Sequence, residues 1–408
     1  MASNEIFDVV VVGGGPSGAT AATDLAVCGH SVLLLDKAGR TKPCGGAVPP
    51  RLIKDFAIPD DLIVAKVRSA RIIAPSDTKV DMPIDKGGYV GMVDRDVFDE
   101  WLRCRAANVG ATRRKGTFED FSRDADGTAV VHYRVRGPDG TEAVETVRAR
   151  SVIGADGAIS GVARIAVPEA GKSTYVFAYH EIIAAPEPDR QDAQNPGPDL
   201  FDRERCDVFY NGKLSPDFYS WIFPHGKTIS VGTGTAHKGF SMRDAVGELR
   251  GQTKLAHLKT IRREGAPIPL KPLRKWDNGR DVVLAGDAAG VVAPASGEGI
   301  YYAMFGGRLA AQAVDRFLLT GDARALKLAR KRFMKAHRQV FWVLGIMQHF
   351  WYQSDKRRER FVSMCRDKDV QELTWQSYMH KELVRKKPVA HVKIFFKDMA
   401  QLLGLVAP

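Results

Sequence analysis

The feature that most constrains this chain is a glycine-rich turn between an apolar strand and a helix. Residues 6–12, IFDVVVV, have the apolar, β-branched composition of a buried parallel strand. The turn that follows has the spacing G-x-G-x-x-G and comprises Gly13, Gly15, Pro16, Ser17 and Gly18. Glycine permits a tight turn and a close approach of the backbone to a ligand, and the start of the following helix attracts phosphate. The arrangement predicts a diphosphate site.

The next strand supplies the acidic residue that a dinucleotide site needs. The helix after the turn is expected to end at Gly29, and residues 31–37, SVLLLDK, form the second strand of a βαβ unit. Asp36 ends this strand, where a carboxylate accepts hydrogen bonds from a ribose diol. We include the adjacent Lys37 among the expected cofactor contacts. The unit as a whole predicts a dinucleotide-binding α/β domain.

Two further glycine–aspartate turns favour FAD over a nicotinamide dinucleotide. They lie in residues 152–164, VIGADGAISGVAR, and in residues 282–300, VVLAGDAAGVVAPASGEGI. The residues expected at the cofactor are Asp156, Gly157, Gly286, Asp287, Gly297, Gly299 and Ile300. A second acid can hold the ribityl chain of an extended flavin, and the backbone at the last glycines can approach its ring. Of the two dinucleotides, only FAD is long enough to need binding motifs from both ends of the polypeptide chain.

The segments between these motifs indicate a second, strand-rich domain. Residues 66–93 alternate in polarity and predict antiparallel strands, and residues 94–111 have helical spacing. Residues 129–150 predict a hairpin, and residues 150–157 another strand that ends in a glycine turn. Residues 165–275 lack the βαβ pattern and are rich in aromatic and strand-forming residues. After residue 290 the chain is expected to be mainly helical.

Charge is concentrated at the end of the chain. The formal net charge is +12, and residues 301–408 contain 21 Lys and Arg against 9 Asp and Glu, so this part carries the whole excess. An apolar stripe at helical spacing runs through residues 324–351: Leu326, Ala329, Phe333, Val340, Phe341, Leu344, Met347 and Trp351. Further basic residues follow this stripe: Lys356, Arg357, Arg358, Arg385, Lys386 and Lys387. A basic amphipathic helix indicates an anionic membrane surface. The alternative is a helix packed into the core with a solvated basic face. Nucleic acid is disfavoured because no nucleic-acid motif occurs.

Composition excludes several other classes. With 44% hydrophobic residues the chain can bury a core, which excludes disorder as its main state. Its five cysteines form no C-x-x-C pair, so neither a disulfide framework nor a metal site is expected. The N-terminus, MASNEIFD, lacks the basic region of a signal peptide, and no uncharged run of 18 apolar residues occurs. We expect a cytoplasmic protein that can bind peripherally to a membrane.

The order of these motifs resembles the FAD-dependent hydroxylase-like superfamily. GGGPSG, Asp36, Arg95 in VDRDVFDEWL, GADG and AGDAAG follow one another over nearly 300 residues. The resemblance implies that Arg95 contacts the diphosphate or ribityl part of FAD. It also implies that Asp156 and Gly157 serve both FAD and nicotinamide binding. Because no second G-x-G-x-x-G occurs, NADPH is expected to visit the flavin without a Rossmann domain of its own.

Two further segments resemble the geranylgeranyl reductase family, and most closely the (bacterio)chlorophyll geranylgeranyl reductases of phototrophs. They are PCGGAVPP at residues 43–50 and PDFYSWIFP at residues 216–224, the latter followed by Gly232 and Gly234. Together with residues 373–405 the resemblance spans nearly the whole chain. It implies NADPH-driven reduction of isolated C=C bonds in a geranylgeranyl chain to phytyl, for (bacterio)chlorophyll biosynthesis. The substrate is a prenyl diphosphate or a prenylated tetrapyrrole.

The residues make chemical sense of that reaction. Tyr219, Trp221 and Phe223 alternate, so they share one face of a strand and are expected to bind the apolar chain. An isolated alkene resists hydride attack alone, so a proton must arrive with or before the hydride. Cys44 is the candidate acid, with Tyr219 and water as alternatives. Its loop also includes Gly45, Gly46 and Ala47, which we expect to lie at the flavin.

The predicted fold class is therefore α/β, with a Rossmann-like FAD-binding domain, a mostly antiparallel β substrate domain and a helical C-terminal region. The expected bounds are 1–65, 94–165 and 276–322 for the FAD-binding domain, 66–93 and 166–275 for the substrate domain, and 323–408 for the basic helical region. The competing functions are a flavin monooxygenase of a small aromatic or quinone and a non-enzymatic membrane scaffold of pigment assembly. Oxygen consumption distinguishes the first, and the intact glycine and aspartate motifs argue against the second.

Overall fold

The computed structural model describes residues 5–37, 42–84, 87–171, 173–186 and 201–381. These residues form two compact units, each built from several segments of the chain. The first unit comprises the described residues of 1–42, 95–175 and 267–338, and the second those of 43–94, 176–266 and 339–381. Residues 43–65, which the sequence placed with the FAD-binding domain, make their contacts within the second unit.

The first unit is built on a seven-stranded sheet. Its strands are β1 (Ile6–Val12), β2 (Val32–Asp36), β8 (Thr112–Lys115), β9 (Thr117–Arg123), β10 (Ala129–Arg136), β11 (Glu142–Gly154) and β17 (Val282–Leu284). The order is β8-β2-β1-β11-β10-β9, with β17 also paired to β11. Strands β8, β2, β1, β11 and β17 run parallel, as the βαβ pattern predicts. Strand β1 lies between β2 and β11, which explains its fully buried valines.

One long strand replaces two expected ones. The hairpin predicted at residues 129–150 is confirmed, since β10 and β11 pair antiparallel. The separate strand expected at residues 150–157 is wrong, because β11 is continuous from Glu142 to Gly154. Its first part pairs with β10 and its last part runs parallel to β1 and β17. No turn residue interrupts RARSV, so the backbone has no reason to break there.

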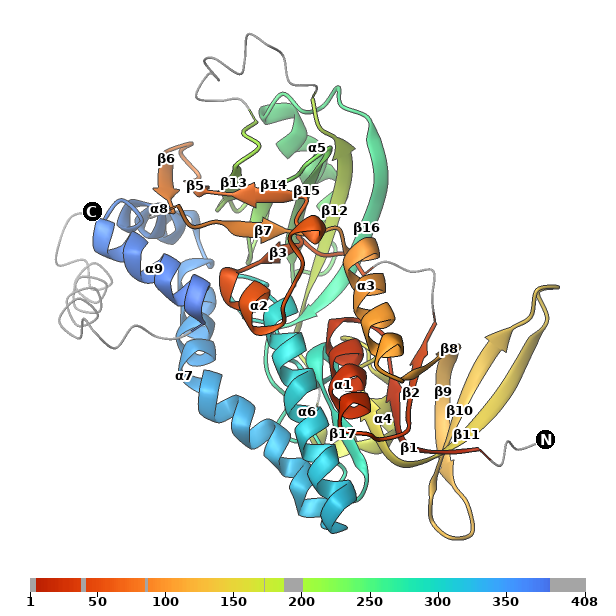
Figure 1. The fold of residues 1–408 in the computed structure, drawn as a ribbon. Helices are drawn as coiled ribbons and strands as arrows, with labels where there is room; N and C mark the ends of the chain where they lie inside the picture. Colours follow the sequence, from red (N-terminus) through yellow and green to blue (C-terminus); the bar gives the residue numbers. More distant parts are fainter. Residues whose placement is uncertain (1–4, 38–41, 85–86, 172, 187–200, 382–408) are drawn as a thin grey trace. The chain divides into compact units, whose positions relative to one another are not determined.

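Helices cover this sheet. They are α1 (Pro16–Val27), α3 (Arg95–Asn108), α4 (Gly161–Ala166) and α6 (Ile300–Thr320), with short 3-10 turns at Pro168–Ala170, Gly286–Ala289 and Ala323–Leu326. Helix α1 packs against α3 and α6 (Figure 1). The approach of α6 is close because Gly307 has no side chain: a Cβ there would lie 2.2 Å from the carbonyl oxygen of Ser17. The glycine-rich turn is thereby held between two helices and the sheet.

The second unit contains a larger sheet and a smaller one. The seven-stranded sheet has the order β16 (Thr260–Pro269), β12 (Tyr175–Ala184), β15 (Thr228–Thr235), β14 (Ser220–His225), β13 (Arg205–Phe209), β5 (Ser69–Ile73) and β6 (Lys79–Pro83). The three-stranded sheet has the order β3 (Ala47–Val48), β7 (Val90–Met92) and β4 (Ala65–Val67). The expected antiparallel character is confirmed, although β5 also pairs parallel with β13.

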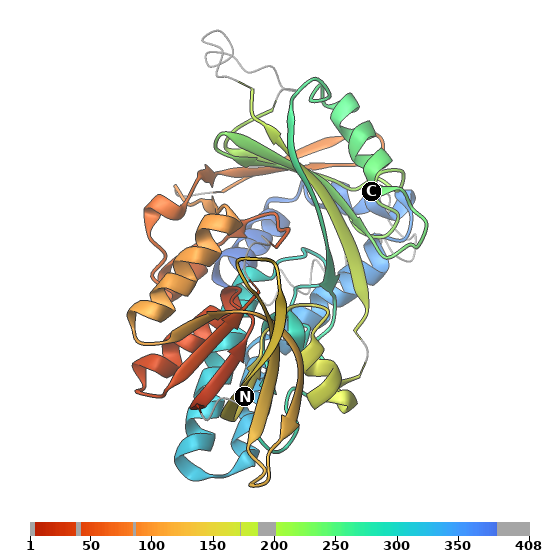
Figure 2. The same cartoon turned by 90° about the vertical axis from the view of Figure 1, so that its right-hand side faces the viewer.

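Helix α5 (Met242–Gln252) covers one face of the seven-stranded sheet (Figure 2). Its buried side chains join a cluster of apolar residues from that face, including Ile183, Ile222 and Val231. The other helices are α2 (Pro50–Asp55), α7 (Lys327–Trp351), α8 (Asp355–Met364) and α9 (Lys368–His380), with a 3-10 turn at Asp60–Leu62. The helical character expected after residue 290 is confirmed as far as residue 381; residues 382–405 of the C-terminal resemblance lie outside the described residues.

Candidate functional site

Glycine is required at each of the three motif positions of the first turn for a different physical reason. Gly13 has φ +103°, and a Cβ there would lie 2.3 Å from the carbonyl oxygen of Ala155. A Cβ on Gly18 would lie 1.9 Å from the carbonyl oxygen of Gly13. At Gly15, by contrast, no atom of the described residues other than its chain neighbours lies within 4 Å of the Cβ position. The first glycine makes the turn, the third lets the helix pack, and the second leaves space beside the helix N-terminus, as diphosphate binding requires.

A buried hydroxyl lies next to this space. Ser17 is only 5% exposed, and its Oγ has no hydrogen-bond partner among the described residues. Native proteins rarely leave such a group unsatisfied, so Ser17 fits a donor to a phosphate oxygen. Gly286 makes the close approach possible, because a Cβ there would lie 2.7 Å from the Cβ of Ser17. The first and last motifs of the sequence therefore meet here.

Two carboxylates flank the turn. Asp36 accepts a hydrogen bond from the backbone N–H of Gly14 at 2.6 Å, so one of its oxygens fixes the turn itself. Asp287 forms an ion pair with Lys42, a partner that the sequence analysis did not identify. The side chain of Asp287 is 8% exposed, so Lys42 balances a nearly buried charge. Lys37 is exposed beside Asp36.

The end of the last motif forms the start of α6. Gly297 has φ +63°, Gly299 is the N-cap residue and Ile300 is the first residue of the helix. A Cβ on Gly299 would lie 3.9 Å from Oδ1 of Asp287. The N-termini of α1 and α6 thus both belong to this region of the first unit. Backbone N–H groups at helix N-termini and the helix dipoles favour an anionic ligand.

Asp156 and Arg95 have protein partners of their own. Asp156 accepts hydrogen bonds from the hydroxyl of Ser160 and from the backbone N–H of Gly161 at 2.7 Å, which caps α4. Burial raises the pKa of Asp156 above its ordinary value. Arg95 is 5% exposed and forms a two-pronged ion pair with Asp99 at 2.8 and 2.7 Å. Asp156 thus caps α4 and Arg95 forms its ion pair within α3, and the contact of both residues with FAD stays a prediction.

In the second unit, the loop of Cys44 lies against the aromatic strand. A Cβ on Gly45 would lie 3.1 Å from the ring of Phe223. His225, two residues further along β14, binds the carbonyl oxygen of Gly45 through Nε2 at 3.1 Å. Gly46 has φ +72°, and its N–H donates to Sγ of Cys44 at 3.4 Å. Cys44 is half-buried. The next residue of its loop, Gly45, contacts both Phe223 and His225.

His225 was missed by the sequence analysis. Its side chain is 5% exposed, and its Nδ1 lies 3.3 Å from Oδ1 of Asp94. Each ring nitrogen therefore faces an acceptor, a carboxylate on one side and the carbonyl of Gly45 on the other. A Cβ on Gly46 would lie 2.5 Å from Cε1 of His225, so glycine is required for this contact. The sequence did contain a signal for this residue, since His225 directly follows Phe223 and Pro224 at the end of the PDFYSWIFP motif.

Tyr219, Trp221 and Phe223 form one continuous aromatic row. The ring centroids of Tyr219 and Trp221 are 5.9 Å apart, and those of Trp221 and Phe223 are 6.1 Å apart. Tyr219 and Trp221 are 8% and 6% exposed. The trailing glycine Gly232 has a packing role: a Cβ on it would lie 2.3 Å from the indole of Trp221. The expected shared face is confirmed by this geometry, and the glycine of β15 makes room for the largest ring.

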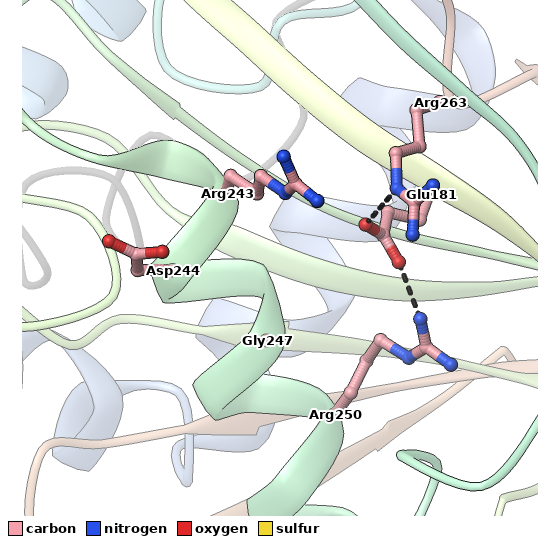
Figure 3. Close-up of a pocket in the computed structure, with 6 residues that line it drawn as sticks. All are labelled: Glu181, Arg243, Asp244, Gly247, Arg250 and Arg263. Carbon is pink, nitrogen blue, oxygen red and sulfur yellow. Dashed lines mark hydrogen bonds and ion pairs between the residues drawn. The ribbon is translucent and has the colours of Figure 1, made fainter.

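A charged cavity lies on the opposite face of the same sheet. Its volume is about 450 Å³, and it is lined by Glu181, Arg243, Asp244, Gly247, Arg250 and Arg263 (Figure 3). Glu181 binds Arg250 at 2.5 Å and Arg263 at 2.9 Å, while Asp244 points away from them. An apolar polyprenyl chain does not fit a lining of this kind. The cavity is therefore no candidate for the prenyl chain.

The C-terminal helices correct part of the charge interpretation. Leu326, Ala329 and Phe333 are fully buried, so the apolar stripe of α7 packs into the protein, as the second interpretation expected. Arg358, counted with the surface charges, is 2% exposed; it donates to the carbonyl oxygens of Ser215, at 3.3 Å, and Pro216. It therefore anchors the turn before the aromatic row. The basic residues 385–387 lie outside the described residues.

A membrane-spanning helix and a metal site are both absent from the part of the chain that the structure describes. No helix there is long and apolar enough to cross a membrane. No group of three His, Cys, Asp or Glu side chains is close enough to hold a metal ion.

The fold and the first-unit site together define an FAD-binding flavoprotein. An FAD-binding domain model matches residues 7–195. The chain belongs to the geranylgeranyl diphosphate reductase family of oxidoreductases. It is 56% identical to the geranylgeranyl diphosphate reductase of Rhodobacter capsulatus, over 98% of this chain and 99% of that one. It is 36% identical to the chloroplastic geranylgeranyl diphosphate reductase of rice, over 98% of this chain and 87% of that one.

A solved structure has the same fold. The geranylgeranyl bacteriochlorophyll reductase-like protein of Thermoplasma acidophilum superposes with a TM-score of 0.77 at 21% identity. The match covers 95% of this chain and 99% of the other. The superfamily fold expected from the order of the motifs is thereby confirmed.

Proposed function

We propose that this chain is an FAD-dependent, NADPH-driven reductase of the isolated C=C bonds of a geranylgeranyl chain, yielding phytyl for (bacterio)chlorophyll biosynthesis. The geranylgeranyl group of the substrate is attached either to a free diphosphate or, as an ester, to (bacterio)chlorophyll. The observation that carries the proposal is the contact between the Cys44 loop and the aromatic row, in a chain 56% identical to a geranylgeranyl diphosphate reductase. Both sequence segments that resemble the family thus form one structural feature.

The chemistry divides between cofactor and protein. Each reduction adds one hydride and one proton across an alkene and consumes one NADPH. Bound FAD supplies the hydride step. The first-unit turn holds the cofactor through Ser17, the open space at Gly15 and the N-termini of α1 and α6. The aromatic row of Tyr219, Trp221 and Phe223 binds the apolar chain and faces the positive charge that develops at a tertiary carbon.

Cys44 is our candidate for the proton donor. The supporting observation is that Gly45, the next residue of its loop, contacts Phe223 and His225 of the aromatic strand. Cys44 also follows Lys42, the partner of Asp287, by two residues in the sequence. Tyr219 and water remain the alternative donors.

The experiment that tests the function is an anaerobic incubation with NADPH. We expect geranylgeranyl diphosphate or geranylgeranyl-bacteriochlorophyll to gain hydrogens in pairs, measured as product mass, without oxygen. The two substrates, run in parallel, separate the free from the esterified chain. A product that forms only with oxygen would contradict a reductase and favour a monooxygenase.

Replacement of Cys44 by serine is expected to slow alkene reduction and spare the flavin. A general acid contributes about 100- to 10,000-fold to a rate, so a loss in this range is expected for the prenyl substrate. FAD content and the rate of flavin reduction by NADPH should stay near those of the wild type. Stopped-flow absorbance separates the two half-reactions. Wild-type alkene reduction by the variant would exclude Cys44 as the acid and leave Tyr219 or water.

We further propose peripheral contact with an anionic membrane through one face of α7. Exposed residues at positions 331, 335, 338, 342, 346 and 349 share a single stripe of the helix: Lys331, Lys335, Arg338, Trp342, Ile346 and His349. Trp342 and Ile346 are 68% and 48% exposed. A basic stripe that ends in exposed apolar side chains suits a lipid headgroup region.

Binding to vesicles that contain anionic lipid is expected to fall as salt rises. Exposed charges are screened at about 1 M salt, where the Debye length is about 3 Å. Co-sedimentation with vesicles measures the bound fraction, and vesicles of zwitterionic lipid are the control. Substitution of Trp342 by alanine should weaken the binding that persists at high salt. Equal binding to both kinds of vesicle would remove the electrostatic part of this proposal.

A further inference from the structure

A row of side chains runs across the sheet from the aromatic strand. Trp221 of β14 and His180 of β12 both pair with Gly232 of β15, so the three positions share one face. A Cβ on Gly232 would lie 2.3 Å from the indole of Trp221 and 2.7 Å from Cβ of His180. Without that side chain the two rings approach to 6.3 Å between centroids. The glycine thus brings an imidazole beside the proposed substrate-binding indole.

A continuous chain of hydrogen bonds connects these rings to a carboxylate. Nε1 of Trp221 donates to Oγ of Ser230 at 3.1 Å, and that oxygen lies 2.9 Å from Nδ1 of His180. Nε2 of His180 lies 3.0 Å from Oε2 of Glu264 on β16. Nε of Arg262 lies 2.9 Å from the other oxygen of Glu264. The chain therefore begins at an indole N–H and ends at a charged pair.

The partners fix the direction of every bond. An indole N–H can only donate and a carboxylate can only accept. Glu264 is ionised: burial opposes its charge, but the hydrogen bond from His180 and the charge of Arg262 hold the pKa of Glu264 below its ordinary value. His180 then carries its hydrogen on Nε2, Nδ1 accepts from the hydroxyl of Ser230, and that hydroxyl accepts from Trp221. With this tautomer of His180, every group in the chain has a partner.

Folding alone does not require this chain. Ser230 is fully buried and His180 is 3% exposed, and replacing a buried hydrogen-bonded pair by apolar groups of the same shape can be nearly neutral for stability. The opposite face of the same sheet is packed by apolar side chains. The polar chain ends at the indole, which indicates a role there.

We infer that Glu264, His180 and Ser230 are positioning residues for Trp221. They hold the indole plane along the prenyl chain, and hydrogen bonding toward a carboxylate increases the electron density of its ring. Hydrogen bonds in a chain polarise one another in this way. An indole of this kind is a better partner for positive charge developing at a tertiary carbon. The inference rests on the proposed function, since it requires a prenyl chain at Trp221.

A double-mutant cycle tests it in the full-length protein loaded with FAD. The variants are Ser230→Ala, Trp221→Phe and the two combined. Ser230→Ala is expected to lower kcat for alkene reduction about tenfold, which is about 1.4 kcal/mol, with flavin reduction by NADPH unchanged. In the Trp221→Phe background the same substitution should have no further effect, because phenylalanine has no N–H to position. An equal loss in both backgrounds would overturn the inference.

Two further measurements separate position from charge. Glu264→Gln keeps an acceptor for His180 and removes the charge, so we expect kcat to fall while the affinity for geranylgeranyl diphosphate without NADPH stays the same. The ultraviolet resonance Raman spectrum of Trp221, obtained by subtracting the Trp221→Phe spectrum, should shift in Ser230→Ala as the indole N–H loses its acceptor. An unshifted band would overturn the inference. A wild-type protein that reduces no prenyl substrate would instead overturn the proposed function.

Discussion

Replacing Gly15 with alanine is expected to lower FAD affinity by about tenfold or more, about 1.4 kcal/mol, without impairing folding. Apart from its chain neighbours, none of the residues that the structure describes has an atom within 4 Å of the Cβ position of Gly15, and its φ of −74° suits alanine. The new methyl group would occupy the space that we assign to the cofactor diphosphate. FAD content after gel filtration and the thermal unfolding midpoint of the cofactor-free protein measure the two effects.

Gly18 provides the matched control. A Cβ there would lie 1.9 Å from the carbonyl oxygen of Gly13, so Gly18→Ala should distort the turn and cost about 1–3 kcal/mol of stability in the cofactor-free protein. The methyl group of Gly15→Ala should therefore clash with the cofactor, whereas that of Gly18→Ala should clash with the protein itself. Full FAD occupancy in Gly15→Ala would show that the diphosphate does not lie in front of α1.

Replacing Glu181 with glutamine is expected to destabilise the second unit by about 3–5 kcal/mol. The side chains of Glu181 and Arg250 are 7% and 10% exposed, and the neutral amide would leave the buried guanidinium of Arg250 without its counter-charge. Arg250 also donates to the carbonyl oxygen of Leu258, so its movement would disturb the chain after α5. Urea unfolding followed by circular dichroism measures the loss.

The same carboxylate predicts a dependence on pH. Burial opposes the charge of Glu181, but hydrogen bonds from Arg263, Tyr179 and Arg250 outweigh it and hold the pKa below its ordinary value. The stabilisation is therefore present above the pKa of the unfolded state and is lost as pH falls through the lower folded-state pKa. Glu181→Gln should remove this part of the acid dependence. Asp244→Asn, an exposed change at the same cavity, should shift stability by no more than about 0.5 kcal/mol. Equal stability of both variants would contradict the ion-pair argument.

Local patterns predicted the parts of the fold that depend on short segments. The βαβ unit, its glycine turn and Asp36 were predicted because strand, turn and helix signals follow one another within about 30 residues. The aromatic row was predicted for the same reason, since alternation places Tyr219, Trp221 and Phe223 on one face. The long strand β11 was divided wrongly, because a strand that changes partners carries no mark of the change in its sequence.

Partners distant in sequence could not be predicted. Lys42 reaches Asp287 across 245 residues, and His225 reaches Gly45 across 180. Only the tertiary fold brings such residues together, and a single lysine or histidine has no spacing that indicates its partner. Burial was misjudged where charge suggested exposure: Arg358 lies beneath the surface because three carbonyl oxygens surround its guanidinium.

The first unit consists of three separate segments, and this has a consequence for its synthesis. The turn at Gly13–Gly18 leaves the ribosome early, but its partners Gly286 and Gly307 follow almost 300 residues later. At roughly 5–20 residues per second, the cofactor site waits for roughly 15–60 s before it can close. During that time helix α1 lacks its neighbour α6. A nascent chain of this design therefore depends on protection from aggregation until its last third emerges.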